Sequence, residues 1–109
     1  MPILYHLLPP TEWETALRGE QYHPASLASE GFIHFSTQAQ LLGSATQFFT
    51  DADELVVLEV PEKRLKPQLK YEAAPDGRLF PHYYGPLDLA LVENTRLLFR
   101  NAQGEWEWD

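Results

Sequence analysis

The sequence contains no cysteine among its 109 residues. That absence excludes a disulfide scaffold, a zinc site built on thiolates and a cysteine nucleophile. A small domain that folds without disulfides fits the reducing cytoplasm better than an oxidising compartment. The chain also lacks the run of about 20 apolar residues that a membrane-spanning helix needs, and no basic flank precedes a long apolar segment at its start. We therefore expect a soluble cytoplasmic protein with no membrane partner and no signal peptide.

Positively charged side chains are scarce. Eight lysines and arginines accompany sixteen aspartates and glutamates, and the formal net charge is −8. Lysine and arginine supply most of the non-specific affinity of proteins for phosphate backbones. The loose basic cluster at Lys63, Arg64, Lys66 and Lys70 is typical of a solvated surface. No long nucleic acid is therefore expected as a partner, whereas a ligand the size of one nucleotide remains compatible with the charge.

Apolar residues are present in the amount that one core requires. Hydrophobic residues make up 44 % of the chain and aromatic residues 13 %, which argues against disorder. The length is that of one typical domain, and no repeat, low-complexity tract or linker divides the sequence. We expect a single domain over residues 1–109, as a monomer or a homodimer.

Two segments have the pattern of a helix start. Thr11 and Glu14 fit a capping box, which predicts a short helix through Arg18. Thr37 and Gln40 repeat the pattern ahead of residues 38–49, where apolar side chains recur at helical spacing on one face. Between the two helices, residues 20–31 contain several turn-forming residues and are predicted to be irregular.

The predicted strands fall mostly in the later part of the chain. Short apolar or alternating runs indicate strands, and Phe80–Pro86, with aromatic residues enclosed by prolines and a glycine, indicates a rigid loop. Helices early and strands late favour an α+β fold, with a small mixed sheet of about five to six strands and two main helices. The strands are expected at residues 3–8, 32–35, 55–60, 69–72, once or twice within 87–99, and at 105–108 after a hairpin turn.

Three histidines lie in apolar or rigid surroundings: His6 and His34 on predicted strands, and His82 in the aromatic loop. Alternate side chains of a strand face opposite sides, so a histidine between two core residues points away from them. Imidazole is the usual acid–base group near neutral pH. The sequence therefore predicts a polar cleft with these three candidate catalytic residues. The alternative is that each is a hydrogen-bonded structural residue, as single histidines in apolar strands usually are.

Ser36 and Thr37 follow His34 and open the second predicted helix. Unpaired amides at a helix start suit a phosphate or a carboxylate, so both residues are candidates for ligand binding, and Thr37 is also a candidate cap. No glycine-rich phosphate loop or nucleophile elbow occurs. Three histidines are chemically able to hold zinc, but no metal-ligand spacing is present, and no metal is expected.

Two motifs, Gly31–Thr37 and Phe80–Leu87, closely resemble those of a family of small bacterial proteins, the domain of unknown function 952 family. Tyr5, His6 and the segment Pro24–Gly31 extend the resemblance over nearly the whole chain. The family is similar to the ADP-ribosyltransferase fold, whose relatives include poly-ADP-ribose polymerases and RNA 2′-phosphotransferases. The resemblance thus implies an ADP-ribosyltransferase-like fold.

The wider resemblance also implies roles for individual residues. His6 is similar to the first-strand residue that holds the nicotinamide-side ribose, and Gly31–Ser36 is similar to the strand that braces the nicotinamide pocket. The region that matches the catalytic glutamate of that superfamily is Phe80–Pro86, which contains no acid and in which His82 takes the prominent polar place. Glu72 is the carboxylate on the predicted strand that precedes this region.

Three functions remain open at this point. The first is a transferase or hydrolase acting on NAD, as substrate, or on a related nucleotide or ribose derivative. The second is a non-catalytic nucleotide-binding module, which the missing glutamate favours. The third is a protein-interaction domain that uses Trp106 and Trp108 on an edge strand, unless these residues cover the protein's own core. For the first, the candidate ligand-binding residues are Ser36, Thr37, Glu72, Tyr83 and Tyr84.

Overall fold

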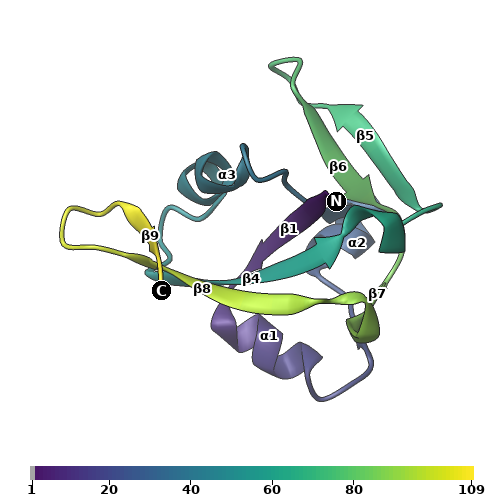
Figure 1. Ribbon diagram of the computed structural model, residues 1–109, viewed down its shortest axis with the longest axis horizontal. Helices are drawn as coiled ribbons and strands as arrows, with labels where there is room; N and C mark the ends of the chain where they lie inside the picture. The colour runs from purple at the N-terminus through teal and green to yellow at the C-terminus, as the bar shows by residue number, and fades with distance from the viewer. Residues whose placement is uncertain (1) are drawn as a thin grey trace.

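The structure is a computed structural model that describes residues 2–109. Its largest sheet has four strands in the order β1-β4-β8-β9, and each neighbouring pair is antiparallel. Figure 1 shows this sheet running through the middle of the molecule. Its strands are β1 (Ile3–Leu8), β4 (Glu54–Pro61), β8 (Asn94–Arg100) and β9 (Trp106–Trp108).

A second, three-stranded antiparallel sheet has the order β3-β6-β5, and β2 pairs with β7 in a two-stranded ribbon. The hairpin of β5 and β6 projects from the body of the molecule (Figure 1). The main-chain bridge between Tyr5 and Ser36 ties the three-stranded sheet to β1. The elements are β2 (Gln21–Tyr22), β3 (Ile33–His34), β5 (Leu69–Ala73), β6 (Leu79–Tyr83) and β7 (Leu87–Asp88).

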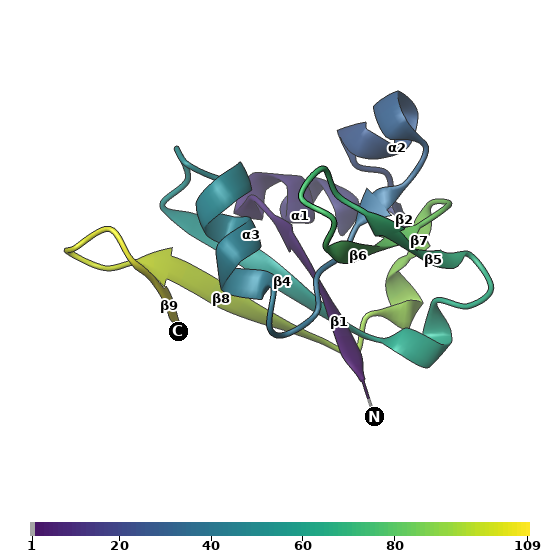
Figure 2. The ribbon, with the colours of Figure 1, turned by 90° about the horizontal axis from the view of Figure 1, so that it is seen from above.

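Three α-helices and two 3₁₀-helices complete the described part of the chain: α1 (Pro10–Ala16), α2 (Ala25–Glu30), α3 (Leu41–Phe48), η1 (Glu62–Arg64) and η2 (Leu89–Leu91). Helices α1 and α3 lie on opposite sides of the four-stranded sheet, and α2 lies near β3 and the hairpin (Figures 1 and 2). None of the helices in residues 2–109 is both long and apolar enough to cross a membrane.

The two faces of the four-stranded sheet cover two separate apolar clusters. One cluster contains Leu4 and Leu8 of β1 and extends toward α1 and the three-stranded sheet. The other contains Leu7 of β1 and packs against Leu41 and Ala45 of α3. Strand β1 is therefore buried on both faces, since alternate side chains enter different clusters.

Burial on both faces corrects the prediction for His6. Alternation does place this side chain opposite Leu7, but that face is covered too, and His6 is only 7 % exposed. Its ring lies against the rings of Tyr22 and Phe35, with centroids 5.2 and 5.6 Å away. His6 is thus part of the interior rather than of an open cleft.

The starts of α1 and α3 differ from the two predicted helix starts. Helix α1 begins at Pro10, after Pro9, with no side-chain cap, so Thr11 is not its cap. Proline suits the first turn because its missing amide would have no partner there. Gln40 does accept a hydrogen bond from the Thr37 amide at 3.1 Å, but this pair closes a turn, and α3 begins only at Leu41.

Two segments predicted to be irregular are regular. Helix α2 lies within residues 20–31, between Pro24 and Gly31, whose φ of 88° gives the left-handed turn that ends the helix. Strand β6 includes Pro81, in what was predicted to be a loop. The Pro81 carbonyl accepts from the Phe35 amide just beyond the end of β3, so the missing amide of Pro81 lies where this two-residue ladder stops.

The architecture is therefore a mixed fold of α-helices and several antiparallel sheets. The predicted mixture of helices and strands is confirmed in this coarse form. The predicted single sheet of five to six strands is wrong, because the described residues form sheets of four, three and two strands. The prediction of two main helices missed α2, which has only six residues.

Both nitrogens of the buried His6 ring have partners. Nδ1 lies 2.5 Å from the carbonyl oxygen of His34, and Nε2 lies 2.8 Å from the hydroxyl of Tyr22. A carbonyl can only accept, so Nδ1 carries the proton and Nε2 accepts from Tyr22. Desolvation by burial lowers the pKa of His6 from 6.5 to about 4, despite the opposing effect of the hydrogen bond to His34. The ring is therefore neutral at neutral pH and holds β1 to β2 and β3.

We predict that His6 makes the folded protein less stable at mildly acidic pH. The unfolded chain binds a proton at this ring below about pH 6.5, whereas the folded protein does so only near pH 4. The free energy of unfolding should fall by about 1.4 kcal/mol per pH unit across this window, and by roughly 3 kcal/mol in all. Chemical denaturation at several pH values should show this loss for the native protein and a flatter dependence for His6→Asn. Equal slopes for the two proteins would contradict the assignment, and His23→Gln, at an exposed histidine, is the control.

The tryptophans of β9 cover the protein's own core. Trp106 is buried in the cluster under α3, and Trp108 packs against its edge. The guanidinium groups of Arg100 and Arg96 lie 4.3 and 3.9 Å from the centroids of the Trp106 and Trp108 rings. Neither indole is therefore a free aromatic surface for a partner.

Trp106 generates a second prediction, because its buried Nε1 has no hydrogen-bond partner in residues 2–109. Trp106→Ala should reduce the free energy of unfolding by about 3–5 kcal/mol, since it leaves a large cavity. Trp106→Phe keeps most of the apolar packing and removes the unpaired donor, so it should cost much less. Thermal or chemical unfolding of the two variants tests this order, and similar losses for both would contradict it, because phenylalanine keeps most of the packing that alanine removes.

Candidate functional site

The short ladder between β3 and β6 brings two histidines together. His34 is directly opposite His82 in this antiparallel pair, and side chains at opposite positions share one face of a sheet. The two ring centroids are 5.4 Å apart and the rings are nearly perpendicular. Ile33 and Phe35, the neighbours of His34, are buried, which confirms that His34 points away from the core.

Glu72 on β5 holds the His82 ring. Its Oε1 lies 2.8 Å from Nδ1 of His82 and accepts a hydrogen bond from the Tyr84 hydroxyl at 2.5 Å. The hydrogen bond from Tyr84, followed by the one from His82, lowers the pKa of Glu72, and the same carboxylate raises the pKa of Tyr84. Glu72 is therefore ionised at neutral pH and directs the Nδ1–H of His82 toward itself.

Glu30 at the end of α2 holds the His34 ring in the same manner. Its Oε2 lies 2.5 Å from Nε2 of His34, and both side chains are about half exposed. Gly31 turns the chain between the helix and β3, which brings these residues within reach of each other. Two carboxylate–imidazole pairs thus stand side by side, one on each strand of the β3–β6 ladder.

Phe32 joins the two pairs into one aromatic surface. Its ring stacks on that of His82, with centroids 3.9 Å apart and an interplanar angle of 17°. The same ring meets His34 edge-on at 4.8 Å and Tyr84 at 5.4 Å. Glu30 and His34 are exposed, whereas the side chain of His82 is only 13 % exposed. We call the set of Glu30, Phe32, His34, Glu72, His82 and Tyr84 the histidine face.

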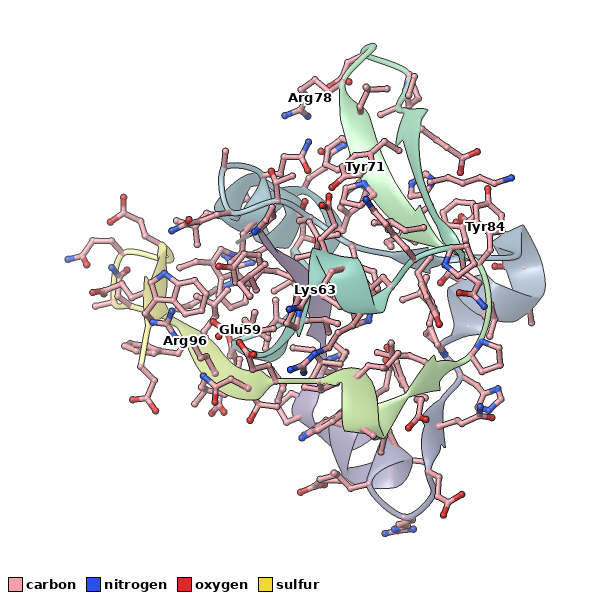
Figure 3. The ribbon with its side chains drawn as sticks, turned by 45° about the vertical axis from the view of Figure 1, so that its right-hand side comes forward. Glu59, Lys63, Tyr71, Arg78, Tyr84 and Arg96 are labelled. Atoms are coloured by element: carbon pink, nitrogen blue, oxygen red, sulfur yellow. The ribbon has the colours of Figure 1, made fainter. Side chains whose placement is uncertain are left out.

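Electrostatically, the histidine face is acidic. Glu30 and Glu72 contribute two carboxylates, and the adjacent cation is Lys70, which is opposite His82 in the β5–β6 ladder. Its Nζ lies 5.1 Å from the centroid of the Tyr84 ring, in a cation–π contact. Figure 3 shows Tyr84 and Tyr71 on the side of the molecule that carries the hairpin, with Arg78 near its tip.

Four residues predicted for the site lie on this face: His34, His82, Glu72 and Tyr84. His6 lies beneath it and is connected through its bond to the His34 carbonyl. The structure therefore brings two of the three predicted histidines together at the surface and leaves the third in the interior.

The other three predicted ligand-binding residues lie away from the histidine face. Ser36 is buried, and its hydroxyl shares a hydrogen bond of 2.9 Å with that of Ser44. Tyr83 points from β6 into the core, where its ring meets that of Phe35. Thr37 is half-buried in the turn before α3. These positions place no hydroxyl of the three beside His34 or His82.

Sequence reasoning missed two members of the face, Phe32 and Glu30. Phe32 is two residues before His34, so strand alternation alone puts the two side chains on the same side. Glu30 is four residues before His34, a spacing that places side chains together on a helix. Its contact here depends instead on the turn at Gly31, which follows an unrecognised helix.

No three or more histidine, aspartate or glutamate side chains of residues 2–109 are arranged to hold a metal ion. A hollow of about 820 Å³ lies elsewhere on the surface, near β2 and η2, and includes His23. Another of about 430 Å³ is lined by residues that include Trp13 and Arg96. The histidine face contributes to neither hollow.

Comparison with known proteins identifies relatives of the chain. A family model described as "Protein of unknown function (DUF952)" matches residues 7–95. The crystal structure of protein CC0527 from Caulobacter crescentus has a TM-score of 0.88 and 32 % identity, covering 96 % of this chain and 93 % of that one. The solution NMR structure of CC0527 has a TM-score of 0.83 and 33 % identity, covering 94 % and 90 %. No curated protein matches the chain. The chain therefore belongs to the DUF952 family of proteins of unknown function.

Proposed function

We propose that the histidine face binds NAD or a related nucleotide or ribose derivative, and that the protein acts on it as a transferase or hydrolase. The observation that carries the proposal is the hydrogen bond between Glu72 and Nδ1 of His82. A carboxylate that holds one ring nitrogen fixes the tautomer and the orientation of the ring, which leaves the other nitrogen to exchange a proton with a substrate. His82 is thus the proposed acid–base group.

The aromatic surface beside His82 supports a heteroaromatic ligand. Phe32 and Tyr84 are both partly exposed, and their ring centroids lie 5.4 Å apart with the rings tilted by 50°. Planar bases and nicotinamide rings bind well to aromatic side chains by offset stacking. Such a ligand would lie next to the proposed acid–base group without a deep cavity.

The motif that matches the catalytic glutamate of ADP-ribosyltransferases contains no acid in this chain, and Glu72 is the carboxylate that we propose in its place. It belongs to β5, but the pairing of β5 with β6 brings its carboxylate against His82. We propose that this carboxylate acts in the region where those enzymes use a glutamate, on a fold that is ADP-ribosyltransferase-like. In this proposal NAD is a substrate, no metal takes part, and the protein works in the cytoplasm as a monomer or homodimer.

The second candidate is a nucleotide-binding module without catalysis. It is supported by the same aromatic surface and by the position of Ser36, which is bonded to Ser44 and not free to contact a ligand. A role as a protein-interaction domain through β9 receives no support, because Trp106 and Trp108 pack against the protein's own core.

The proposal predicts binding with turnover. Titration of NAD, ADP-ribose and mononucleotides to millimolar concentration should shift the amide resonances of residues 30–34 and 82–84, and the ligand should be consumed. His82→Gln should lower turnover by about 10²–10⁴-fold, as expected for loss of an acid–base group, and lower affinity by no more than about tenfold. His23→Gln, outside the face, should change neither quantity.

The outcomes separate the two candidates. Binding at the face with no product over a long incubation would establish the non-catalytic module in place of the enzyme. No resonance shift with any of these ligands, or with an uncharged nucleoside, at millimolar concentration would reject both candidates, and with them the proposed ligand site.

A further inference from the structure

The proposed function uses one carboxylate–imidazole pair, yet the histidine face contains two. The pair of Glu30 and His34 is built like that of Glu72 and His82, from a different part of the chain. Each imidazole is bonded through one nitrogen only: Nδ1 of His34 and Nε2 of His82 have no hydrogen-bond partner in residues 2–109. With ring centroids 5.4 Å apart, both rings are close enough to contact one small substrate.

Two free imidazole nitrogens on one face permit two proton transfers in a single reaction. A neutral imidazole removes a proton from a nucleophile, while a protonated one gives a proton to a leaving group. Each adjacent carboxylate holds one nitrogen of its own ring, which fixes the direction of the other nitrogen. Such an arrangement suits a substrate that needs both an activated nucleophile and a protonated leaving group.

The charge of the histidine face restricts the kinds of substrate that can bind there. The charged and titratable groups around the two rings are Glu30 from α2, Glu72 and Lys70 from β5, Tyr84 after β6, and the buried neutral His6 beneath. Lys70 already lies over the Tyr84 ring, and the chain carries a net charge of −8. A phosphate bound at the outer edges of the two imidazoles would lie beside two carboxylates, and like charges at this distance repel. The face therefore favours a ligand without phosphate.

We propose that the substrate is an uncharged nucleoside and that His34 and His82 together hydrolyse its N-glycosidic bond. This inference rests on the proposed function, since it specifies the ribose derivative that the same face takes. The flat base would stack on one of the rings of Phe32 and Tyr84, which are tilted by 50° to each other. The ribose would lie against the outer edges of the two imidazoles, which contact each other edge to face.

The step balances with water as the only co-reactant. One imidazole takes a proton from water as the water oxygen forms a bond to C1′ of the ribose. The bond between C1′ and the base nitrogen breaks, and its electron pair goes to the base. The other imidazole gives a proton to the base, which leaves neutral. The products are free ribose and the free base, and exchange of protons with solvent restores both rings.

The test measures release of free base from inosine, adenosine and uridine by chromatography with the full chain. We expect hydrolysis of at least one nucleoside, with a kcat/KM at least tenfold above that for its 5′-monophosphate. His34→Gln and His82→Gln should each lower kcat by a hundredfold or more, and Glu30→Gln by about tenfold. His23→Gln is the matched control and should have native activity. Thermal unfolding of each variant shows whether it remains folded, and His34, being half exposed, is expected to tolerate substitution.

The failures of this inference and of the proposed function are distinguishable. Faster release of base from NAD or from a nucleoside 5′-monophosphate overturns the phosphate-free substrate and leaves the proposed function standing. Loss of activity in folded His82→Gln with native activity in folded His34→Gln overturns the two-imidazole mechanism only. Absence of release from all three nucleosides overturns the inference, while absence of any binding by nucleosides and nucleotides alike overturns both.

Discussion

The pairing of β3 with β6 is the constraint on which the candidate site depends. It consists of two residue pairs, Ile33 with Tyr83 and His34 with His82. Because strand side chains alternate, the first pair fills the core and the second pair faces outward. The same two-residue ladder therefore joins an apolar contact inside to a pair of imidazoles outside. A shift of register by one residue would exchange the two faces, and burial of Ile33 against the core resists that shift.

His6 connects this ladder to the main sheet. Its ring donates to the His34 carbonyl, which lies on the main chain of β3 directly behind the exposed imidazole. A protonated His6 ring could no longer accept from Tyr22, so the neutral form of the buried ring and the position of β2 depend on each other. The interior histidine thus acts on the site by holding the strand that carries His34. The resemblance implies that His6 contacts ribose directly, but the His6 ring is buried in this structure.

Local patterns predicted β1, β4 and the outward orientation of His34 because each depends on alternation within one strand. They did not predict which face of β1 is covered, since the covering residues come from α1, β2 and the three-stranded sheet. Phe80–Pro86 was interpreted as a loop because Pro81 lacks an amide. The segment nevertheless forms strand β6, because Pro81 lies where the ladder with β3 ends and its missing amide interrupts no pairing within the ladder. The end of that ladder is determined by the tertiary pairing and has no local signal in the sequence. The contact of Glu72 with His82 likewise follows from the register of β5 and β6, for which the sequence contains no local signal.

The acidity of the face and the presence of two histidines are parts of one arrangement. An imidazole without a carboxylate would turn freely at an exposed position, and either nitrogen could carry the proton. Glu30 and Glu72 each fix one ring nitrogen, at the cost of placing negative charge beside any ligand. A phosphate-binding site would need arginine or lysine in their place, and the cation nearby, Lys70, lies over Tyr84. The same two carboxylates that prepare the imidazoles for proton transfer therefore select against phosphorylated ligands, so the chemistry of the face and the charge of its substrate are set by the same residues.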